Sequence, residues 1–170
     1  MDFFISDLHI DDSNIIMYEH RPFVTLEDMK AIIVKNWNAT VTDRDNVYLL
    51  GDIGKSTNIL NELQGNITVV MGNHDKDIYT DLVKLQQKGN ISLYDKPIMI
   101  NGCLWLSHEP IGYMPPECPY LNIHGHLHRF NYGLIGRKWK DGNRYFNVSV
   151  EQINYTPISL EDIGKQIEYN

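Results

Sequence analysis

Six short runs of apolar residues, rich in β-branched and aromatic side chains, divide this chain into strand-sized pieces. The runs lie at 3–6, 47–50, 67–71, 104–107, 121–124 and 145–150. Runs of this length and composition are typical of β-strands. None approaches the ~20 consecutive apolar residues that a membrane-spanning helix needs, so we expect no membrane span.

Helical patterns separate the first three runs. Thr25 and Asp28 form a capping pair for a helix that carries apolar residues at helical spacing as far as Trp37. A second helix is expected over 56–64, and a third helix should end at the C-capping glycine Gly89. The first half of the chain therefore predicts a β-α-β-α-β-α order.

The second half has a different pattern. Asn101-Gly102 lies between two apolar runs and is a strong signal for a β-hairpin, and a second hairpin is expected around Asp141-Gly142. A capping box at Ser159 predicts a final short helix. We therefore predict an α/β fold in which parallel βαβ units continue into antiparallel strands, with helices covering the sheets as an α/β/α sandwich.

Composition limits the domain count, the location and the partners. A chain of 170 residues with 42% hydrophobic residues buries one core, so we expect a single domain over 1–170. Its net charge of -7 argues against strong binding of duplex nucleic acid, which needs many Lys and Arg contacts to phosphate. Cys103 and Cys118 fit no metal-binding spacing, and the first residues lack a signal peptide, which predicts a cytoplasmic protein.

Residue types that bind transition metals follow directly after the strand-like runs. They form five motifs: Asp7-x-His9, Gly51-Asp52, Gly72-Asn73-His74-Asp75, the single His108, and Gly125-His126-x-His128. Each motif alone has an ordinary explanation, because an Asp after a strand often caps a helix and an isolated His is often a hydrogen-bonded structural residue. Together they are expected at the carboxyl edge of the strands, where open α/β sheets bind ligands.

In this order the motifs D-x-H, G-D, G-N-H-D, H and G-H-x-H resemble the calcineurin-like metallophosphoesterases, over the chain from Asp7 to His128. The resemblance implies a four-layer α/β/β/α sandwich of mixed β-sheets flanked by helices. It also implies two divalent transition-metal ions. The first ion would be held by Asp7, His9, Asp52 and His128. The second would be held by Asp52, Asn73, His108 and His126, with Asp52 as the bridge.

The resemblance further implies a reaction. A hydroxide that bridges the two metals would attack the phosphorus in line, His74 would protonate the leaving oxygen, and Asp75 would hold the His74 ring in the required tautomer. Mn²⁺ is the expected metal, with Fe, Zn, Ni or Co as alternatives. The expected substrate is a small phosphate ester or nucleotide-like molecule. A phosphodiesterase is favoured and a phosphomonoesterase is the alternative.

Four points stay open at the level of the sequence. Larger calcineurin-like metallophosphoesterases often extend the second motif to G-D-x-x-D, whereas this chain has Lys55 at the last position. Residues 14–23 resemble small bacterial and phage-encoded members, and Arg21 in this segment is a candidate for phosphate binding beside Asn73 and His74, although a structurally paired Arg is the alternative. A metal-binding protein-interaction scaffold and a nuclease for short oligonucleotides are competing functions, and the oligomeric state is open.

Overall fold

The computed structural model describes residues 1–112, 114, 120–130 and 144–168, which form two β-sheets with flanking helices. The first sheet has the strand order β4-β3-β2-β1-β9. Its strands are Ser92–Tyr94 (β4), Asn66–Val70 (β3), Asn46–Leu49 (β2), Asp2–Ile5 (β1) and Ile158–Ser159 (β9). β1 to β4 run parallel, and β9 pairs antiparallel with β1.

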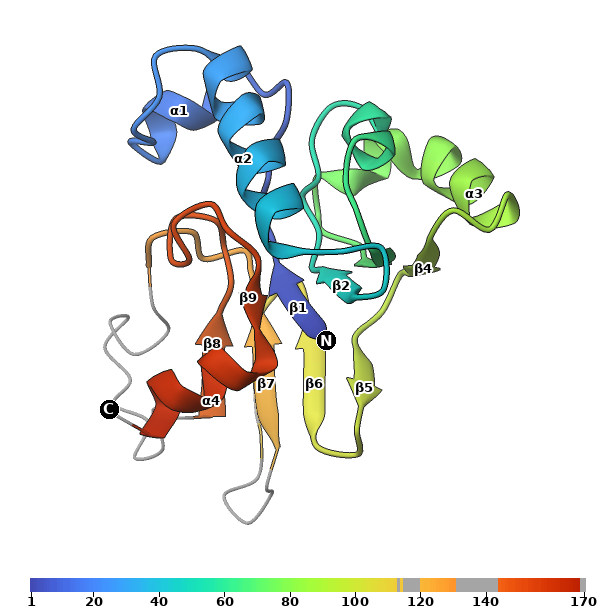
Figure 1. Cartoon of the computed structure of the whole chain (residues 1–170), viewed down its shortest axis with the longest axis vertical. Helices are drawn as coiled ribbons and strands as arrows, with labels where there is room; N and C mark the ends of the chain where they lie inside the picture. The colour runs from blue at the N-terminus through green and yellow to red at the C-terminus, as the bar shows by residue number, and fades with distance from the viewer. Residues whose placement is uncertain (113, 115–119, 131–143, 169–170) are drawn as a thin grey trace.

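The second sheet has the order β5-β6-β7-β8. Its strands are Ile98–Ile100 (β5), Leu104–Ser107 (β6), Leu121–His124 (β7) and Tyr145–Asn147 (β8). Only β5 and β6 are antiparallel, whereas β6, β7 and β8 are parallel. Both sheets are therefore mixed, and the arrows of β1, β6, β7 and β8 point the same way in Figure 1.

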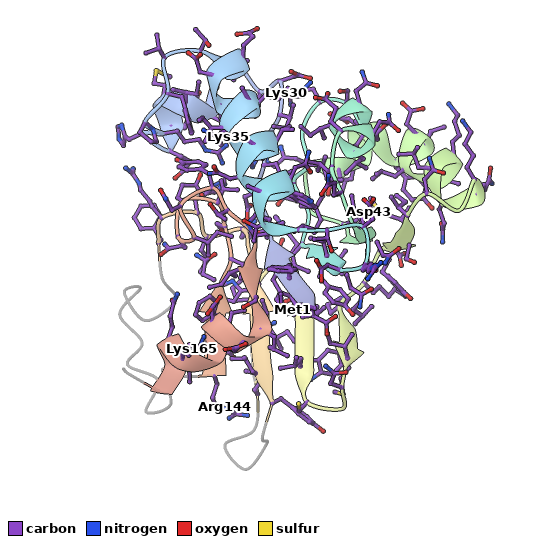
Figure 2. All side chains as sticks on the ribbon, in the orientation of Figure 1. Met1, Lys30, Lys35, Asp43, Arg144 and Lys165 are labelled. Carbon is purple, nitrogen blue, oxygen red and sulfur yellow. The ribbon has the colours of Figure 1, made fainter. Side chains whose placement is uncertain are left out.

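Helices flank the sheets. They are Ile15–Tyr18 (α1), Leu26–Thr40 (α2), Tyr79–Gln87 (α3) and Leu160–Glu168 (α4), with 3₁₀ turns at Asn58–Asn61 and Asp75–Ile78. Figure 2 shows charged side chains such as Lys30 and Lys35 on α2 and Lys165 on α4 at the outside of the molecule. No helix in the described part of the chain is long and apolar enough to cross a membrane.

Strand β1 lies between two apolar clusters, because successive side chains of a strand point to opposite faces. Phe3 and Ile5 belong to the cluster that contains Met29, Ile33 and Trp37 of α2. Phe4 belongs to the other cluster, with Leu106 of β6, Ile123 of β7 and Ile163 of α4. The first sheet is thus covered by α2 on one face and by the second sheet on the other.

Local sequence signals explain several of these elements. The Thr25 side chain accepts a hydrogen bond from the Asp28 N–H at 3.1 Å, which confirms the predicted cap of α2. Asn101 and Gly102 have φ angles of 52° and 69°, as a tight turn between β5 and β6 requires. Gly89 ends α3 with a φ of 76°. Ser159 caps α4 by accepting from the Asp162 N–H at 3.1 Å.

The helix predicted over 56–64 is wrong, because this segment contains only the 3₁₀ turn Asn58–Asn61. Side chains of α2 form hydrogen bonds with the backbone of this segment instead. Trp37 Nε1 donates to the Gln64 carbonyl at 2.8 Å, and Asn38 exchanges hydrogen bonds with the carbonyl of Glu62 and the N–H of Gln64. These contacts, which link residues far apart in sequence, replace the bonds that a regular helix would make.

The predicted antiparallel continuation of the sheet is also wrong in part, since β6, β7 and β8 are parallel. The hairpin expected around Asp141-Gly142 lies outside the described residues. Strands β4 and β9 were not predicted, because runs of three and two residues are too short to show a period. The observed architecture is an α/β fold with two mixed sheets and flanking helices.

Candidate metal centre

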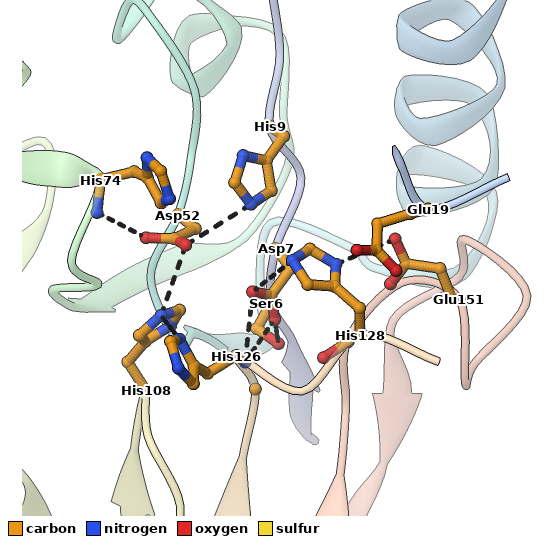
Figure 3. A network of polar contacts seen from close by, with 12 residues as sticks. Ser6, Asp7, His9, Glu19, Asp52, His74, His108, His126, His128 and Glu151 are labelled. Atoms are coloured by element: carbon orange, nitrogen blue, oxygen red, sulfur yellow. Dashed lines mark hydrogen bonds and ion pairs between the residues drawn. The ribbon is translucent and has the colours of Figure 1, made fainter. Parts of the chain in front are cut away.

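The predicted metal-binding motifs meet on one side of the molecule, although they are spread over more than a hundred residues. Asp7 and His9 follow β1, Asp52 follows β2, Asn73 follows β3, His108 follows β6, and His126 and His128 follow β7. Each motif therefore lies just beyond the carboxyl end of its strand. Figure 3 shows the Asp and His side chains of these motifs converging from several loops.

The His and Asp side chains form two groups. The first cluster is Asp7, His9 and His128, and the second cluster is Asp52, His108 and His126. Within each cluster, one potential ligand atom from every residue lies within 4.8 Å of the others. Each cluster contains two imidazoles and one buried carboxylate, which belongs to Asp7 in the first cluster and to Asp52 in the second.

Asp52 lies between the two clusters. Its Oδ2 atom is 3.4 Å from Nε2 of His9 and 3.4 Å from Nε2 of His108. Figure 3 shows these two rings on opposite sides of the Asp52 carboxylate. The same oxygen therefore faces both clusters, while Oδ1 accepts the backbone N–H of His74 at 2.9 Å.

Asn73 joins the second cluster through its side-chain oxygen. Oδ1 lies 2.9 Å from Nε2 of His108 and 3.1 Å from Nδ1 of His126. The two ring nitrogens are themselves 3.1 Å apart. Three potential ligand atoms thus lie within 3.1 Å of one another, as in the coordination shell of a cation.

The backbone at the site is strained. Asp7, His9, Asp52, His126 and His128 have φ angles of 60°, 50°, 54°, 68° and 49°. Residues other than Gly rarely adopt this left-handed conformation, which costs roughly 1–3 kcal/mol per residue and persists where the surrounding structure enforces it. Backbone bonds between loops supply that constraint, because Asp7 N–H donates to Gly51 O at 3.0 Å and His9 N–H donates to Asp52 O at 2.9 Å.

Two motif glycines let the loops approach each other. A Cβ on Gly72 would collide with the side chain of Asp52, and a Cβ on Gly125 would collide with the side chains of Ser6 and Asp7. The Asp7 carboxylate also accepts the Ser6 hydroxyl at 2.5 Å and the His126 N–H at 2.9 Å. Glycine at these positions is therefore a requirement of packing around the two carboxylates.

The electrostatics of the site favour positive charge. Burial alone would raise the pKa of Asp52, but its close contacts with His108 and His9 and the charge of His108 hold that pKa far below its usual range. Burial alone would lower the pKa of His108, yet its bond to Asp52 and the charges of Asp7 and Asp52 raise the pKa to about 9. The carboxylates therefore attract a positive charge, which a proton on an imidazole or a bound cation can supply.

The residues present fit a pair of metal ions. His9 Nε2 is buried and has no hydrogen-bond partner among the described residues, although it faces Asp52. A buried nitrogen of this kind normally has a partner, and a cation between His9 and Asp52 would provide one. The donor set of imidazole, carboxylate and amide oxygen suits divalent transition metals.

Comparison with known proteins relates the chain to an uncharacterized protein and to a solved structure of a protein of unknown function. No model of a known protein family matches it. The uncharacterized protein MJ1445 of Methanocaldococcus jannaschii is 38% identical over 177 aligned positions, which cover 98% of this chain and 90% of MJ1445. The chain belongs to the MJ1445 family. A crystal structure of AQ665 from Aquifex aeolicus, a protein of unknown function, superimposes with a TM-score of 0.68 at 30% identity over 98% of both chains.

In this member of the MJ1445 family, two of the site's imidazoles also have a partner for the ring nitrogen that faces away from the cluster. Nδ1 of His108 lies 2.8 Å from the Leu50 carbonyl oxygen, and Nδ1 of His128 lies 3.1 Å from Oε1 of Glu151. Metal-binding histidines commonly use such partners to fix the ring and its tautomer. Glu151 was not predicted from the sequence, even though it directly follows the last apolar run, just as the other motifs follow theirs.

Asp75 does not hold the ring of His74, so that prediction needs correction. The buried Asp75 carboxylate accepts backbone N–H groups of Asp52, Ile53 and Gly72 at 2.9, 2.9 and 2.8 Å. Burial and the nearby charge of Asp52 raise its pKa, while these three bonds oppose the rise. Asp75 therefore joins two loops of the site.

Arg21 was predicted either to bind a substrate phosphate or to be paired within the structure, and the structure shows the second arrangement. Its side chain has no solvent exposure and donates to the carbonyls of Leu8 and Asp7 at 2.8 and 2.7 Å. It also forms an ion pair with Glu151, with Nη2 2.6 Å from Oε1. The guanidinium is therefore not available to a substrate phosphate.

His74 and Asn73 are the exposed residues of the G-N-H-D motif. The His74 ring meets the His9 ring edge-on, with 5.2 Å between the ring centres. His74 thus lies at the solvent side of the centre, next to a residue of the first cluster. His124, in contrast, is buried at the end of β7, where burial lowers its pKa to about 4.

Proposed function

We propose that this chain is a metal-dependent phosphoesterase that acts on small phosphate esters, and within this class a phosphodiesterase. The observation that carries the proposal is the position of Asp52, whose Oδ2 lies 3.4 Å from an imidazole nitrogen of each cluster. An anion shared by two cation positions is the feature that two-metal hydrolysis requires. The proposal includes the four-layer α/β/β/α arrangement of the calcineurin-like metallophosphoesterases.

The chain's own ligands would hold two divalent ions, with Mn²⁺ as the first choice and Fe, Zn, Ni or Co as alternatives. Asp7, His9 and His128 would hold one ion, Asn73, His108 and His126 the other, and Asp52 both. When bound, such a pair supplies Lewis acidity towards phosphoryl oxygens and lowers the pKa of water. The strained loops fix the ligands before a substrate arrives, so little reorganisation is needed.

His74 would donate a proton to the leaving oxygen of the substrate. Its exposed ring next to His9 supports this role, because the ring can reach a molecule bound at the first cluster without displacing a metal ligand. The backbone N–H of His74 donates to Asp52 Oδ1 at 2.9 Å, which ties the position of the proton donor to the bridging residue.

The exposure of Asn73 and His74 supports a diester substrate, since a site open on this side accommodates groups on both sides of the phosphate. A nucleotide-like diester fits this description. A phosphomonoesterase uses the same centre and is the alternative. A scaffold would have no use for a proton donor beside two intact ligand clusters.

The first test compares bis-p-nitrophenyl phosphate with p-nitrophenyl phosphate as substrates for metal-stripped protein. Mn²⁺, Ni²⁺, Zn²⁺ or Mg²⁺ is added back singly, and the metal-stripped protein serves as the blank. We expect release of nitrophenol from the diester with Mn²⁺ and none from the blank. Faster cleavage of the monoester would assign a phosphomonoesterase.

Absence of turnover with every metal, in protein that binds two metal equivalents, would contradict the proposal and favour the scaffold. The metal content of the same samples is therefore measured by elemental mass spectrometry. A short single-stranded oligonucleotide, added as a third substrate, distinguishes a small-diester specificity from a nuclease.

A further inference from the structure

A chain of buried polar contacts connects the first cluster to a residue outside the recognised motifs. His128 contacts Glu151 through Nδ1, at 3.1 Å from Oε1. The same oxygen of Glu151 accepts Arg21 Nε at 2.8 Å and pairs with Nη2 at 2.6 Å. The side chains of Glu151 and Arg21 have exposures of only 6% and 0%, so these bonds are shielded from water.

Arg21 connects these polar contacts back to the first cluster, so that they form a closed network. It donates to the carbonyl oxygens of Asp7 and Leu8, which belong to the loop that carries the first cluster's Asp7 and His9. At the opposite end of this network, His128 Nε2 lies 3.8 Å from Asp7 Oδ1. Two loops that supply ligands to the same cluster are therefore joined both across the cluster and behind it.

The contact with Glu151 determines which nitrogen of His128 faces the cluster. A carboxylate accepts a hydrogen bond from Nδ1–H, so the lone pair of the neutral ring is on Nε2. Nε2 is the nitrogen nearest to Asp7. Figure 3 shows the His128 ring between Asp7 and the glutamates Glu19 and Glu151.

The second cluster is supported differently. The outer nitrogen of His108 contacts the Leu50 carbonyl oxygen at 2.8 Å, which carries no net charge. A carboxylate behind an imidazole makes the ring a stronger donor to a metal than a neutral carbonyl does. The two metal positions are thus unequal in the residues that support them.

From this network we infer that Glu151 is a positioning residue, which orients His128 and selectively strengthens metal binding at the first cluster. The inference rests on the proposed two-metal centre, although not on its hydrolytic activity. Loss of such a supporting carboxylate typically weakens metal binding about 10- to 100-fold. We expect this loss at the first cluster only.

The test measures Mn²⁺ binding by equilibrium dialysis of metal-stripped full-length protein, with elemental analysis of both compartments. The variants are Glu151→Gln, which removes the charge, and Glu151→Asp, which keeps the charge but withdraws the oxygen from Nδ1. We expect both to weaken one of the two binding steps about 10- to 100-fold and to leave the other step unchanged. The unchanged step also shows that the variant is folded.

Two further variants assign the effect to its cluster. Glu151→Gln in a His128→Ala background should cause no additional loss, because Glu151 acts through that ring. Glu19→Gln is the matched control, since it removes a negative charge from the same side of His128 but leaves the Glu151 contact in place. Its Mn²⁺ binding should equal that of the unmodified protein.

Three outcomes would overturn the inference: unchanged Mn²⁺ binding in Glu151→Gln, equal weakening of both steps, or the same weakening in Glu19→Gln. Binding of two Mn²⁺ equivalents without hydrolysis of any phosphate ester would instead refute the proposed function alone. A protein that binds no Mn²⁺ would refute both. The metal readout therefore separates the two claims.

Discussion

The Asp75 carboxylate accepts a hydrogen bond at 2.9 Å from the backbone N–H of Asp52, so a buried acid of one motif holds the backbone of another. The same carboxylate accepts the N–H groups of Ile53 and Gly72. It thereby joins the loops after β2 and β3 behind the two candidate metal-binding clusters. Asp75 acts on the site through the backbone and not through the His74 ring.

We expect Asp75→Ala to lower the free energy of unfolding by about 3 kcal/mol, because three buried N–H groups would lose their acceptor at ~1 kcal/mol each. Urea denaturation measures this change. Asp75→Asn keeps one acceptor oxygen and should fall between Asp75→Ala and the unmodified protein. Unchanged stability with reduced turnover would instead restore the role of orienting His74.

We expect Asp52→Ala to lose the normal content of two metal ions and also its phosphoesterase activity. The physical reason is that the two ions would face each other without the shared anion that offsets their repulsion. Elemental analysis after dialysis gives the metal content. Asp52→Asn preserves the size of the side chain and tests the charge alone, and a variant that retains two ions would disprove the bridge.

His74→Ala should bind metal normally and lose roughly 10²–10⁴-fold in turnover of the diester, the usual contribution of a general acid. The exposed His20, which lies in no motif, offers His20→Ala as a matched control with full activity. Steady-state kinetics with Mn²⁺ provide the measurement. Full turnover in His74→Ala would exclude it as the proton donor.

Gly125→Ala should destabilise the fold by about 1–3 kcal/mol, because the new methyl group would overlap the buried side chains of Ser6 and Asp7. It should also weaken metal binding at the first cluster by displacing Asp7. Gly164→Ala is the control, since a Cβ there meets no atom within 4 Å in α4. That change should stabilise the protein by about 0.5–1 kcal/mol.

Thermal denaturation of the two glycine variants, with and without Mn²⁺, checks the prediction. Mn²⁺ should raise the melting temperature of Gly164→Ala as much as that of the unmodified protein, because ligand binding to the folded state stabilises it. A Gly125→Ala protein with normal stability would mean that the loops after β1 and β7 can separate without cost.

Local residue chemistry predicted much of the scaffold. The apolar runs located β1, β2, β3, β6 and β7 to within about one residue. Thr25 capped α2 and Asn101-Gly102 turned β5 into β6, because these residues interact with their immediate neighbours in the chain. The same reasoning failed over 56–64, where the backbone bonds to α2 side chains.

The sequence by itself also determined which residues have the chemistry of metal ligands, since side-chain type and order along the chain are local properties. Only the tertiary structure decided which atoms meet. Arg21 and Glu151 are 130 positions apart and still share a buried ion pair, and Asp75 serves backbone groups 22 and 23 positions away. Spacing cannot reveal such partners, because strand order and loop packing bring them together.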